Sequence, residues 1–212
     1  DQGIMASLAR VQTLLDAGTL PVLRPRSLSI DEALGGDGVD GPVVLAIAQA
    51  RRRLPTVARV VRPDATYLIT GGLGGLGLRV ALALVDEGAR SLVLIGRSAP
   101  GPAALDAIAD LVSRGAVVRA LQADVGRRGD LERVLGHVRE RLPPLAGVVH
   151  CAGVLADAIL LRQDAAQFGA VLPAKVHGAW NLHVLTRALP LEMFVVFSSA
   201  AGLLGSPGQA NY

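Results

Sequence analysis

Residues 66–77 read TYLITGGLGGLG, an apolar run that ends in a glycine-rich turn. The run predicts a buried strand over Thr66–Thr70, and the apolar residues after the turn predict a helix over Gly75–Glu87. Farther along the chain, short β-branched runs alternate with helical patterns, which is typical of βαβ units around a parallel sheet. The sequence therefore predicts an α/β protein.

The remaining elements follow at similar spacing. We expect further strands over Ser91–Ile95, Val117–Gln122, Gly147–His150 and Met193–Phe197, and further helices over Ala103–Arg114, Gly129–Arg141 and Ala165–Ala188. This order predicts a Rossmann-type doubly wound parallel sheet, incomplete because the chain ends at Tyr212. Right-handed crossovers place the first and fourth strands side by side, at the switch point where ligands bind.

The glycine spacing gives the turn a chemical meaning. Gly72, Gly74 and Gly77 fit the dinucleotide fingerprint G-x-G-x-x-G, and Gly71, Gly75 and Gly77 fit a related pattern. Without Cβ atoms, the turn can take positive φ and a pyrophosphate can approach the N–H groups at a helix N-terminus. Glycine turns also serve tight strand-to-helix packing, but the strand–turn–helix context favours a nucleotide site.

The ends of the second and third strands indicate which dinucleotide binds. The second strand ends in Gly96-Arg97-Ser98, and Arg97 lies 20 residues after Gly77. Asp or Glu there would bind the ribose hydroxyls of NAD, whereas Arg can pair with a 2′-phosphate and favours NADP. The alternative is an exposed loop arginine. Asp124 and Val125, after the third strand, stand where an adenine contact is expected.

The fourth strand leads into Cys151-Ala152-Gly153, which should line the cofactor near the switch point. Neither His150 nor Cys151 has a partner at metal-ligand spacing, so we expect no metal site. Cys151 is interpreted as a small buried side chain rather than a nucleophile.

Lys175 is the only lysine of the chain. In a regular helix its neighbours at three and four residues are uncharged, so its ammonium must reach a polar cavity or a partner. The alternative is that it extends to solvent, and the nearby Pro173 leaves its direction open. The fifth strand ends in Ser198-Ser199, and Tyr212 follows Ser199 by 13 residues. Both hydroxyls could reach a substrate carbonyl beside the cofactor.

Taken together, these motifs resemble the short-chain dehydrogenase/reductase superfamily, and more closely the ketoreductase domains of polyketide synthases. The matching stretches are residues 67–77, 150–157, 175–182, 197–202 and 208–212. Most short-chain reductases have Asn on the helix and Lys four residues after Tyr. The synthase ketoreductases have Lys on the helix, which is where Lys175 stands.

The resemblance implies that NADPH reduces a β-ketoacyl thioester, carried on an acyl carrier protein, to the β-hydroxyacyl product. It makes Tyr212 the general acid, Ser199 a hydrogen-bond donor to the same carbonyl oxygen, and Lys175 the cation that favours the phenolate. The cofactor-binding residues it implies are Thr70, Gly71, Gly72, Leu73, Gly74, Gly75, Leu76, Gly77, Gly96, Arg97, Ser98, Asp124, Val125, Cys151, Ala152, Gly153, Lys175, Ser198 and Tyr212.

Stereochemistry can also be inferred from the resemblance. B-type ketoreductases, which give the D-hydroxy product, carry Leu-Asp-Asp where this chain has Leu155-Ala156-Asp157. The opposite subgroup has Trp at the position of Leu204, and Pro207 resembles the B-type pattern. We therefore expect the B-type outcome, with Asp157, Leu204 and Pro207 as the stereocontrol residues, although Ala156 departs from the pattern.

The N-terminal region differs from the rest. Its pattern predicts helices over Ile4–Ala17 and Val43–Arg53 and a short strand over Leu20–Leu23. We divide the chain into residues 1–63, a small α/β tail of an upstream domain plus linker, and residues 64–212, a truncated NADP-binding ketoreductase domain. The tail resembles the end of an enoylreductase; the alternative is the end of the ketoreductase's own structural subdomain.

The composition excludes several classes of protein. Hydrophobic residues make up 51% and charged residues 18%, which fits a globular core. The apolar runs are too short to cross a bilayer, and aromatics are only 3%, so we expect no membrane and no nucleic-acid partner. The net charge of +3 supports an anionic partner only weakly. The single cysteine excludes an internal disulfide and indicates a reducing, cytoplasmic compartment.

The resemblance places other synthase domains in cis and allows a homodimeric parent protein. Because the ketoreductase pattern continues past Tyr212, we expect the 212 residues to be inactive on their own. Two rival interpretations stay open. A free-standing short-chain reductase would not carry the long N-terminal region, and a catalytically silent scaffold segment of a megasynthase would not need Lys175, Ser199 and Tyr212.

Overall fold

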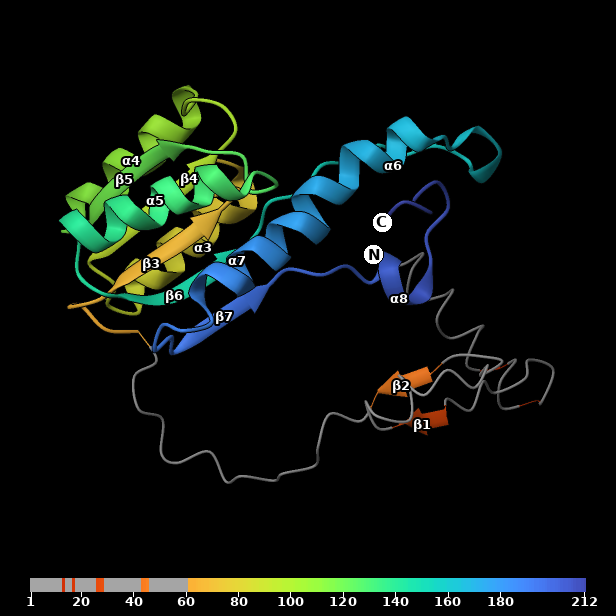
Figure 1. Cartoon of the computed structure of the whole chain (residues 1–212), viewed down its shortest axis with the longest axis horizontal. Helices are drawn as coiled ribbons and strands as arrows, with labels where there is room; N and C mark the ends of the chain where they lie inside the picture. Colours follow the sequence, from red (N-terminus) through yellow and green to blue (C-terminus); the bar gives the residue numbers. More distant parts are fainter. Residues whose placement is uncertain (1–12, 14–16, 18–25, 29–42, 46–60) are drawn as a thin grey trace. The chain divides into compact units, whose positions relative to one another are not determined.

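The computed structural model describes Thr13, Ala17 and residues 26–28, 43–45 and 61–212. The chain forms two compact units, residues 1–56 and 57–212. In the first unit, β1 (Arg26–Leu28) pairs in parallel with β2 (Val43–Leu45) (Figure 1).

The helix predicted over Val43–Arg53 is wrong where the chain is described, because Val43–Leu45 is strand β2. Two adjacent β-branched valines favour a strand, and a short apolar run does not distinguish the two structures by its periodicity. The strand predicted over Leu20–Leu23 lies outside the described residues. Within Ile4–Ala17 only Thr13 and Ala17 are described, and the Ala17 N–H donates to the Thr13 carbonyl (3.0 Å), as in a helix.

The second unit is built on a five-stranded sheet whose strand pairs are all parallel. The strands are β3 (Thr66–Thr70), β4 (Ser91–Gly96), β5 (Val117–Gln122), β6 (Leu145–His150) and β7 (Met193–Val196). Their order is β5-β4-β3-β6-β7, so the first and fourth strands of this unit are neighbours, as predicted. All five begin and end within two residues of the predicted bounds, which confirms the doubly wound sheet.

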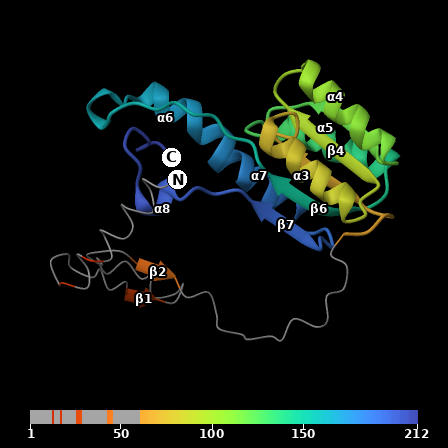
Figure 2. The same cartoon turned by 180° about the vertical axis from the view of Figure 1, so that it is seen from behind.

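Helices cover both faces of this sheet. The helices that do so are α3 (Gly75–Asp86), α4 (Pro102–Ser113), α5 (Arg128–Arg141) and α7 (Gly178–Thr186). Two further helices, α6 (Ala165–Leu172) and the short α8 (Ala201–Leu204), extend beyond the sheet (Figure 1). Helices α5 and α7 lie in front of the sheet in Figure 1, and α3 lies in front of it in Figure 2. No helix in the described part of the chain has the length and apolar character needed to cross a bilayer.

Alternate residues of β3 supply two separate core layers. Tyr67 and Ile69 belong to the layer that includes Leu84 of α3, whereas Leu68 belongs to the layer that includes Leu182 of α7. Each of the four aliphatic side chains is at least nine-tenths buried, and burial of one such side chain contributes about 1.5–3 kcal/mol. Because both faces are covered, the strand reads as a continuous apolar run.

The single helix predicted over Ala165–Ala188 is wrong, because the chain there forms three segments. Helix α6 begins at a capping box between Asp164 and Gln167, a π-helical turn follows over Pro173–His177, and α7 then begins at Gly178. Proline has no N–H to donate inside a helix and its ring crowds the preceding turn. The Gly178 N–H donates to the Pro173 carbonyl, five residues back, so the turn is widened rather than broken.

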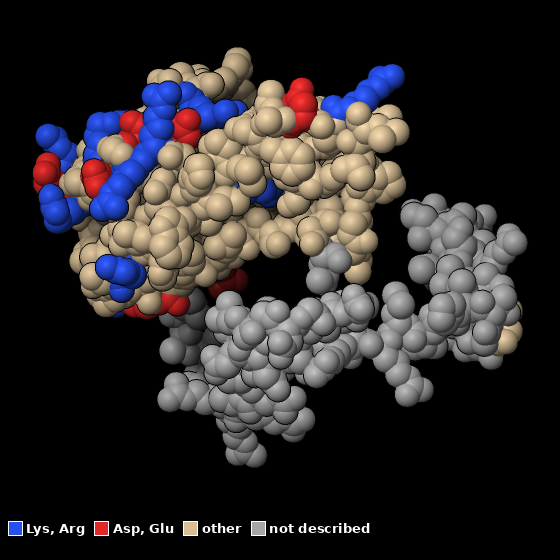
Figure 3. Space-filling view, turned by 45° about the vertical axis from the view of Figure 1, so that its right-hand side comes forward, with Lys and Arg blue, Asp and Glu red and all other residues tan. Residues whose placement is uncertain are grey.

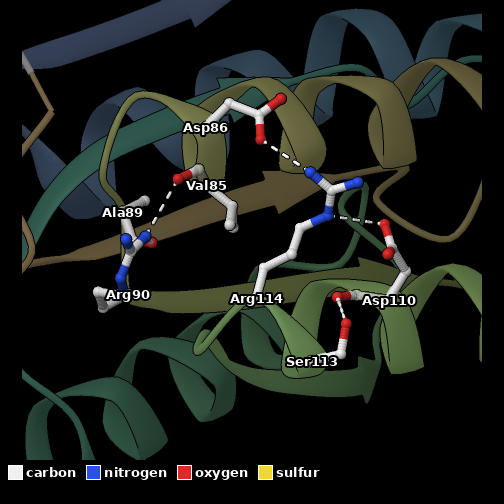
Figure 4. Close-up of polar contacts among 7 residues, drawn as sticks. All are labelled: Val85, Asp86, Ala89, Arg90, Asp110, Ser113 and Arg114. Atoms are coloured by element: carbon white, nitrogen blue, oxygen red, sulfur yellow. Dashed lines mark hydrogen bonds and ion pairs between the residues drawn. The ribbon is translucent and has the colours of Figure 1, made fainter.

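Two exposed arginines, Arg90 and Arg114, bind groups near the ends of helices α3 and α4. Figure 4 shows Arg114 bridging Asp86 of α3 (3.1 Å) and Asp110 of α4 (2.9 Å), while Arg90 donates to the Val85 carbonyl at the end of α3. Each exposed pair contributes about 1 kcal/mol or less. Such pairs fix helix ends against one another without depending on the core.

The charged surface is mixed rather than uniformly basic. Figure 3 shows basic and acidic side chains intermingled at one end of the unit. Arg127 and Arg128, at the start of α5, are both exposed, and Arg128 pairs with Glu132 (2.8 Å). This end of the helix is therefore a solvated charged surface.

Candidate functional site

A cavity of about 550 Å³ opens where β3, β4, β5 and β6 end. It lies at the switch point between β3 and β6. The predicted cofactor residues that line it are Gly71, Leu73, Gly74, Gly75, Leu76, Gly77, Gly96, Arg97, Asp124, Val125, Cys151, Ala152 and Gly153. The predicted residues that do not line it are Thr70, Gly72, Ser98, Lys175, Ser198 and Tyr212.

The glycine turn is held against the loop that follows β6. Gly71 has φ of +63°, and a Cβ on it would lie 2.9 Å from backbone atoms of Ala152. A Cβ on Gly77 would collide with the Gly71 carbonyl oxygen, whereas a Cβ on Gly75 would meet no atom within 4 Å. The turn is therefore closed on its inner side and open on the cavity side.

The open side of this turn suits an anion. Helix α3 begins after Gly74, and no side chain caps it. The first N–H groups of a helix carry partial positive charge and lack intrahelical partners. A phosphate in the cavity would therefore meet a helix N-terminus with no competing side chain.

Arg97 lies in the cavity wall with its charge free. Its side chain is exposed and makes no ion pair with any residue that the structure describes. The backbone is held in place, since the Gln122 amide donates to the Arg97 carbonyl (2.8 Å). A fixed backbone with an unpaired guanidinium fits the predicted contact with a 2′-phosphate.

The loop after β5 is ordered by its own carboxylates. Asp124 accepts from the Gly126 N–H (2.9 Å), and its own N–H donates to Asp130 (2.8 Å). That hydrogen bond is the main cause that lowers the pKa of Asp130, with Arg133 and Arg127 acting in the same direction and desolvation against them. The predicted adenine contact thus stands on a rigid turn.

Lys175 and Tyr212 meet beside this cavity. Lys175 lies in the π-helical turn, and its Nζ stands 4.1 Å from the centroid of the Tyr212 ring. The same Nζ lies 3.5 Å from the point that a Cβ on Gly153 would occupy, and Gly153 lines the cavity. Both side chains are half-buried, so an ammonium and a phenol converge at the edge of the cavity.

Ser199 does not join this pair through a hydrogen bond. Its Oγ accepts from the Ala201 N–H (3.1 Å) at the start of α8. Ser198 is exposed and makes no hydrogen bond with any described residue. Helix α8 still lies next to the tyrosine, because a Cβ on Gly202 would stand 3.7 Å from the Tyr212 carbonyl oxygen.

The segment that leads to Tyr212 is bound to the loop after β6. The Ala158 N–H donates to the Gly208 carbonyl (2.9 Å), and the Asn211 amide donates to the Ala156 carbonyl (2.8 Å). The predicted stereocontrol residue Asp157 accepts from the Gln209 amide (3.1 Å). The other two stereocontrol residues are exposed: Leu204 is 80% accessible, and Pro207 lies in the exposed turn before Gly208.

Sequence reasoning missed part of the cavity wall. The missed residues are Ile95, Ala123, Val154, Gly169, Ala170, Pro173 and Ala174. The last four form two pairs of small residues spaced by four, Gly169 with Pro173 and Ala170 with Ala174, which places each pair on one face of a helix. The spacing of these small residues could have indicated a helix face that lines a cavity. Within this predicted helix, only Lys175 was expected to have a functional role.

Cys151 is unreactive by its environment. It lines the cavity, and burial raises the pKa of its thiol to about 11. No group of three His, Cys, Asp or Glu side chains among the described residues is placed to hold a metal ion.

Comparisons with known proteins agree on one family. The family model described as KR domain matches residues 65–212. Over 97% of its length the chain is 37% identical to the phthioceranic/hydroxyphthioceranic acid synthase of Mycobacterium tuberculosis, of which it covers 10%.

Two solved structures are similar over most of this chain. A ketoreductase domain from the bacillaene assembly line superposes with a TM-score of 0.70 at 35% identity, over 75% of this chain and 38% of that one. A structure of A-type ketoreductases from a modular polyketide synthase superposes with a TM-score of 0.68 at 39% identity, over 72% of this chain and 32% of that one. The chain thus spans about a tenth of the curated relatives and about a third of these solved chains.

We predict different outcomes for two neighbouring glycines of the turn. Gly77→Ala should lower the free energy of unfolding by about 1–3 kcal/mol, because the new Cβ collides with the Gly71 carbonyl. Gly75→Ala should leave it within about 0.5 kcal/mol, because its Cβ enters open space. Urea denaturation measures both, and equal losses would contradict the geometry of the turn.

We also predict that Cys151 reacts slowly with iodoacetamide at pH 8. With a pKa of about 11, only about one thiol in a thousand is ionised there, and the rate should rise about tenfold per pH unit up to pH 10. The urea-unfolded chain, with the same single cysteine, is the control. A folded chain that reacts at pH 8 as fast as the unfolded one would refute the raised pKa.

Proposed function

The chain belongs to the KR domain family, and from this we propose that it uses NADPH to reduce a β-ketoacyl thioester, carried on an acyl carrier protein, to the β-hydroxyacyl thioester. The observation that carries the proposal is the meeting of Lys175 and Tyr212 beside Gly153, at the edge of the cavity under the glycine turn. An acid and a cation stand there next to a space suited to a dinucleotide.

The residues present fit such a cofactor. The uncapped start of α3 and the open space at Gly75 suit the pyrophosphate, Arg97 suits the 2′-phosphate, and Asp124 and Val125 border the adenine end. Gly96, Cys151, Ala152 and Gly153 supply further wall, while Thr70 and Gly72 hold the turn from behind. We also propose Ser98 and Ser198 as cofactor contacts, although neither lines the cavity.

The chain's own residues would supply the proton that the carbonyl oxygen takes up during the reduction. Bound NADPH supplies the hydride to the carbonyl carbon. The Tyr212 hydroxyl donates its proton to the carbonyl oxygen, and the Lys175 ammonium stabilises the phenolate that remains. The Ser199 hydroxyl, whose Oγ accepts from the Ala201 N–H, keeps its own hydrogen to donate to the same oxygen.

We infer the B-type, D-hydroxy outcome for this reduction. Asp157 supports it, because its bond to Gln209 fixes the loop on one side of Tyr212. Leu204 and Pro207 support it by residue type, because Leu204 stands where the opposite subgroup has Trp and Pro207 resembles the B-type pattern. Similar chains include A-type ketoreductases, so the chirality of the product is a separate measurement.

We further propose that the chain works inside a polyketide synthase, with the carrier protein and other domains in the same polypeptide. The identity with synthases extends over residues N-terminal to the KR match. We assign residues 1–63 to the tail of an upstream domain plus linker.

Oxidation of NADPH in the presence of a β-ketoacyl thioester tests the activity, using the 212-residue chain and a longer synthase polypeptide that contains it. Tyr212→Phe should lower kcat by about 10²–10⁴, and Ser199→Ala by about 10²–10³. Tyr67→Phe is the matched control, since Tyr67 is the other tyrosine and is fully buried in the core. Absence of turnover with both NADPH and NADH in the longer polypeptide would overturn the proposal, and chiral chromatography of the product tests the D configuration.

A second prediction concerns the choice of cofactor. Arg97→Ala should raise the Kd for NADPH about 10- to 100-fold, the loss expected for hydrogen bonds to a charged group, and leave the Kd for NADH within about twofold. Arg139→Ala, an exposed arginine of α5 outside the cavity, is the control. An equal rise in Kd for NADPH and NADH would contradict a contact between Arg97 and the 2′-phosphate.

A further inference from the structure

His150 is a buried imidazole that the proposed reaction does not use. It is the last residue of β6, and only 2% of its surface is accessible. Its position puts it between the glycine turn, the loop at Cys151 and the π-helical turn that carries Lys175. A buried polar ring in such a place needs a physical reason.

One edge of the ring is fixed by β3. The His150 Nδ1 lies 2.6 Å from the Thr70 Oγ1, and the backbones of these two residues are paired in the sheet. The same Oγ1 accepts from the Ala152 N–H (3.3 Å), so the Thr70 hydroxyl has its hydrogen left to donate to Nδ1. The ring is therefore oriented by a strand that cannot move without breaking the sheet.

The Cε1 atom, which is bonded to Nδ1, faces the turn that carries Lys175. A Cβ on Gly178, directly after that turn, would stand 3.2 Å from the His150 Cε1 and 2.7 Å from the Val125 Cγ2, so both side chains lie beneath the turn. The ring thus lies directly under a glycine three residues after Lys175. A single π-helical turn is a local departure from the α-helix and is frequent at functional sites, so a ring packed against its end can affect where its side chains lie.

The surroundings of this ring favour its neutral form. Burial lowers the pKa of His150, and the positive charge of Lys175 acts in the same direction, while the backbone carbonyls of Ala174 and Lys175 oppose it. A neutral ring with Nδ1 as the acceptor has its Nε2–H on the side of the turn. His150 Nε2 makes no hydrogen bond with any described residue. The ring therefore contacts the turn through van der Waals packing rather than through a hydrogen bond.

We propose that His150 is a positioning residue, which seats the π-helical turn on β3 so that the Lys175 ammonium lies over the Tyr212 ring. The inference rests on the proposed function for its kinetic meaning, but the placement of Lys175 is measurable without any reaction. His150 does not touch substrate and acts only through Lys175.

The single lysine makes this placement directly observable. Reductive methylation with ¹³C-formaldehyde labels Lys175 and the N-terminus and leaves the lysine charge in place. In the folded 212-residue chain the Lys175 dimethylammonium signal should be shifted upfield by the Tyr212 ring, and Tyr212→Leu should abolish that shift. The α-amino signal is recognised by its titration near pH 7.7–8.0, about the usual range for that group.

Two amide variants distinguish the contact of the ring with Thr70 from its contact with the turn. His150→Asn keeps an oxygen for the Thr70 hydroxyl but loses the part that reaches Gly178, whereas His150→Gln reaches the turn. We expect the Asn variant to lose the upfield shift and the Gln variant to keep most of it. Thr66→Val is the matched control. It removes a buried hydroxyl that is hydrogen-bonded to Ser91 (3.0 Å), at the end of β3 opposite to Thr70.

The kinetic test uses the longer synthase polypeptide. His150→Asn should lower kcat by about ten- to a hundredfold, the scale of an ångström-sized misplacement, with KM for the thioester and Kd for NADPH within about twofold. His150→Gln should recover most of kcat, and Thr66→Val should leave it unchanged. A structural role alone would lower stability without this split between kcat and KM.

The outcomes separate this inference from the proposed function. An unchanged Lys175 signal in His150→Asn, or equal loss in both amide variants, overturns the positioning role whether or not the protein reduces thioesters. The expected signals without any turnover would instead overturn the function and leave the positioning intact. If His150→Asn fails to fold by circular dichroism, Gly178→Ala changes the contact from the other side, where the new Cβ would meet both His150 and Val125. A Lys175 signal that keeps its full upfield shift in that variant also overturns the proposal.

Discussion

The close approach of two backbones determines this site. Gly71 comes so near to Ala152 that only a residue without Cβ fits, and it does so at positive φ. This contact joins the end of β3 to the end of β6, the neighbouring strands at the switch point of the sheet. The cavity, the uncapped start of α3 and the wall at Gly153 all follow from it, because each is a direct continuation of one of these two strands.

The position of Lys175 depends on a defect in a helix. Lys175 does not lie in the regular helix that begins at Ala165, because Pro173 has no N–H to donate and the turn that follows it is π-helical. Asn181 then ties the following helix to the loop after β5, since its amide donates to the carbonyls of Val125 (3.1 Å) and Gly126 (3.2 Å). The turn that carries the lysine thus leads directly into a helix that is anchored to this loop, and the lysine side chain is half-buried against Tyr212.

The sequence predicted the parts whose signals are local. The strand over Thr66–Thr70 and its neighbours over Ser91–Gly96 and Leu145–His150 are buried apolar runs, and their predicted bounds were correct to within two residues because both faces are covered there. The break at Pro173 was missed because an apolar pattern persists through it, and the wall at Gly169 because small residues give no periodic signal of their own. The hydrogen bond from Ala201 that occupies Ser199 depends on the three-dimensional course of α8, which no spacing in the sequence specifies.

The two halves of the site differ in what stabilises them. The glycine turn grows out of strands that are fully buried, whereas Tyr212 is held by hydrogen bonds between residues 208–211 and the loop at Ala156–Ala158. That loop is followed by Leu160 and Leu161, which are 73% and 95% exposed, so little apolar burial supports it. Segments with few buried contacts open at a lower free energy than the core does. We therefore expect Tyr212 to separate from Lys175 at a lower free energy than the cavity beside the glycine turn collapses, so that a molecule could occupy the cavity before Tyr212 is in place.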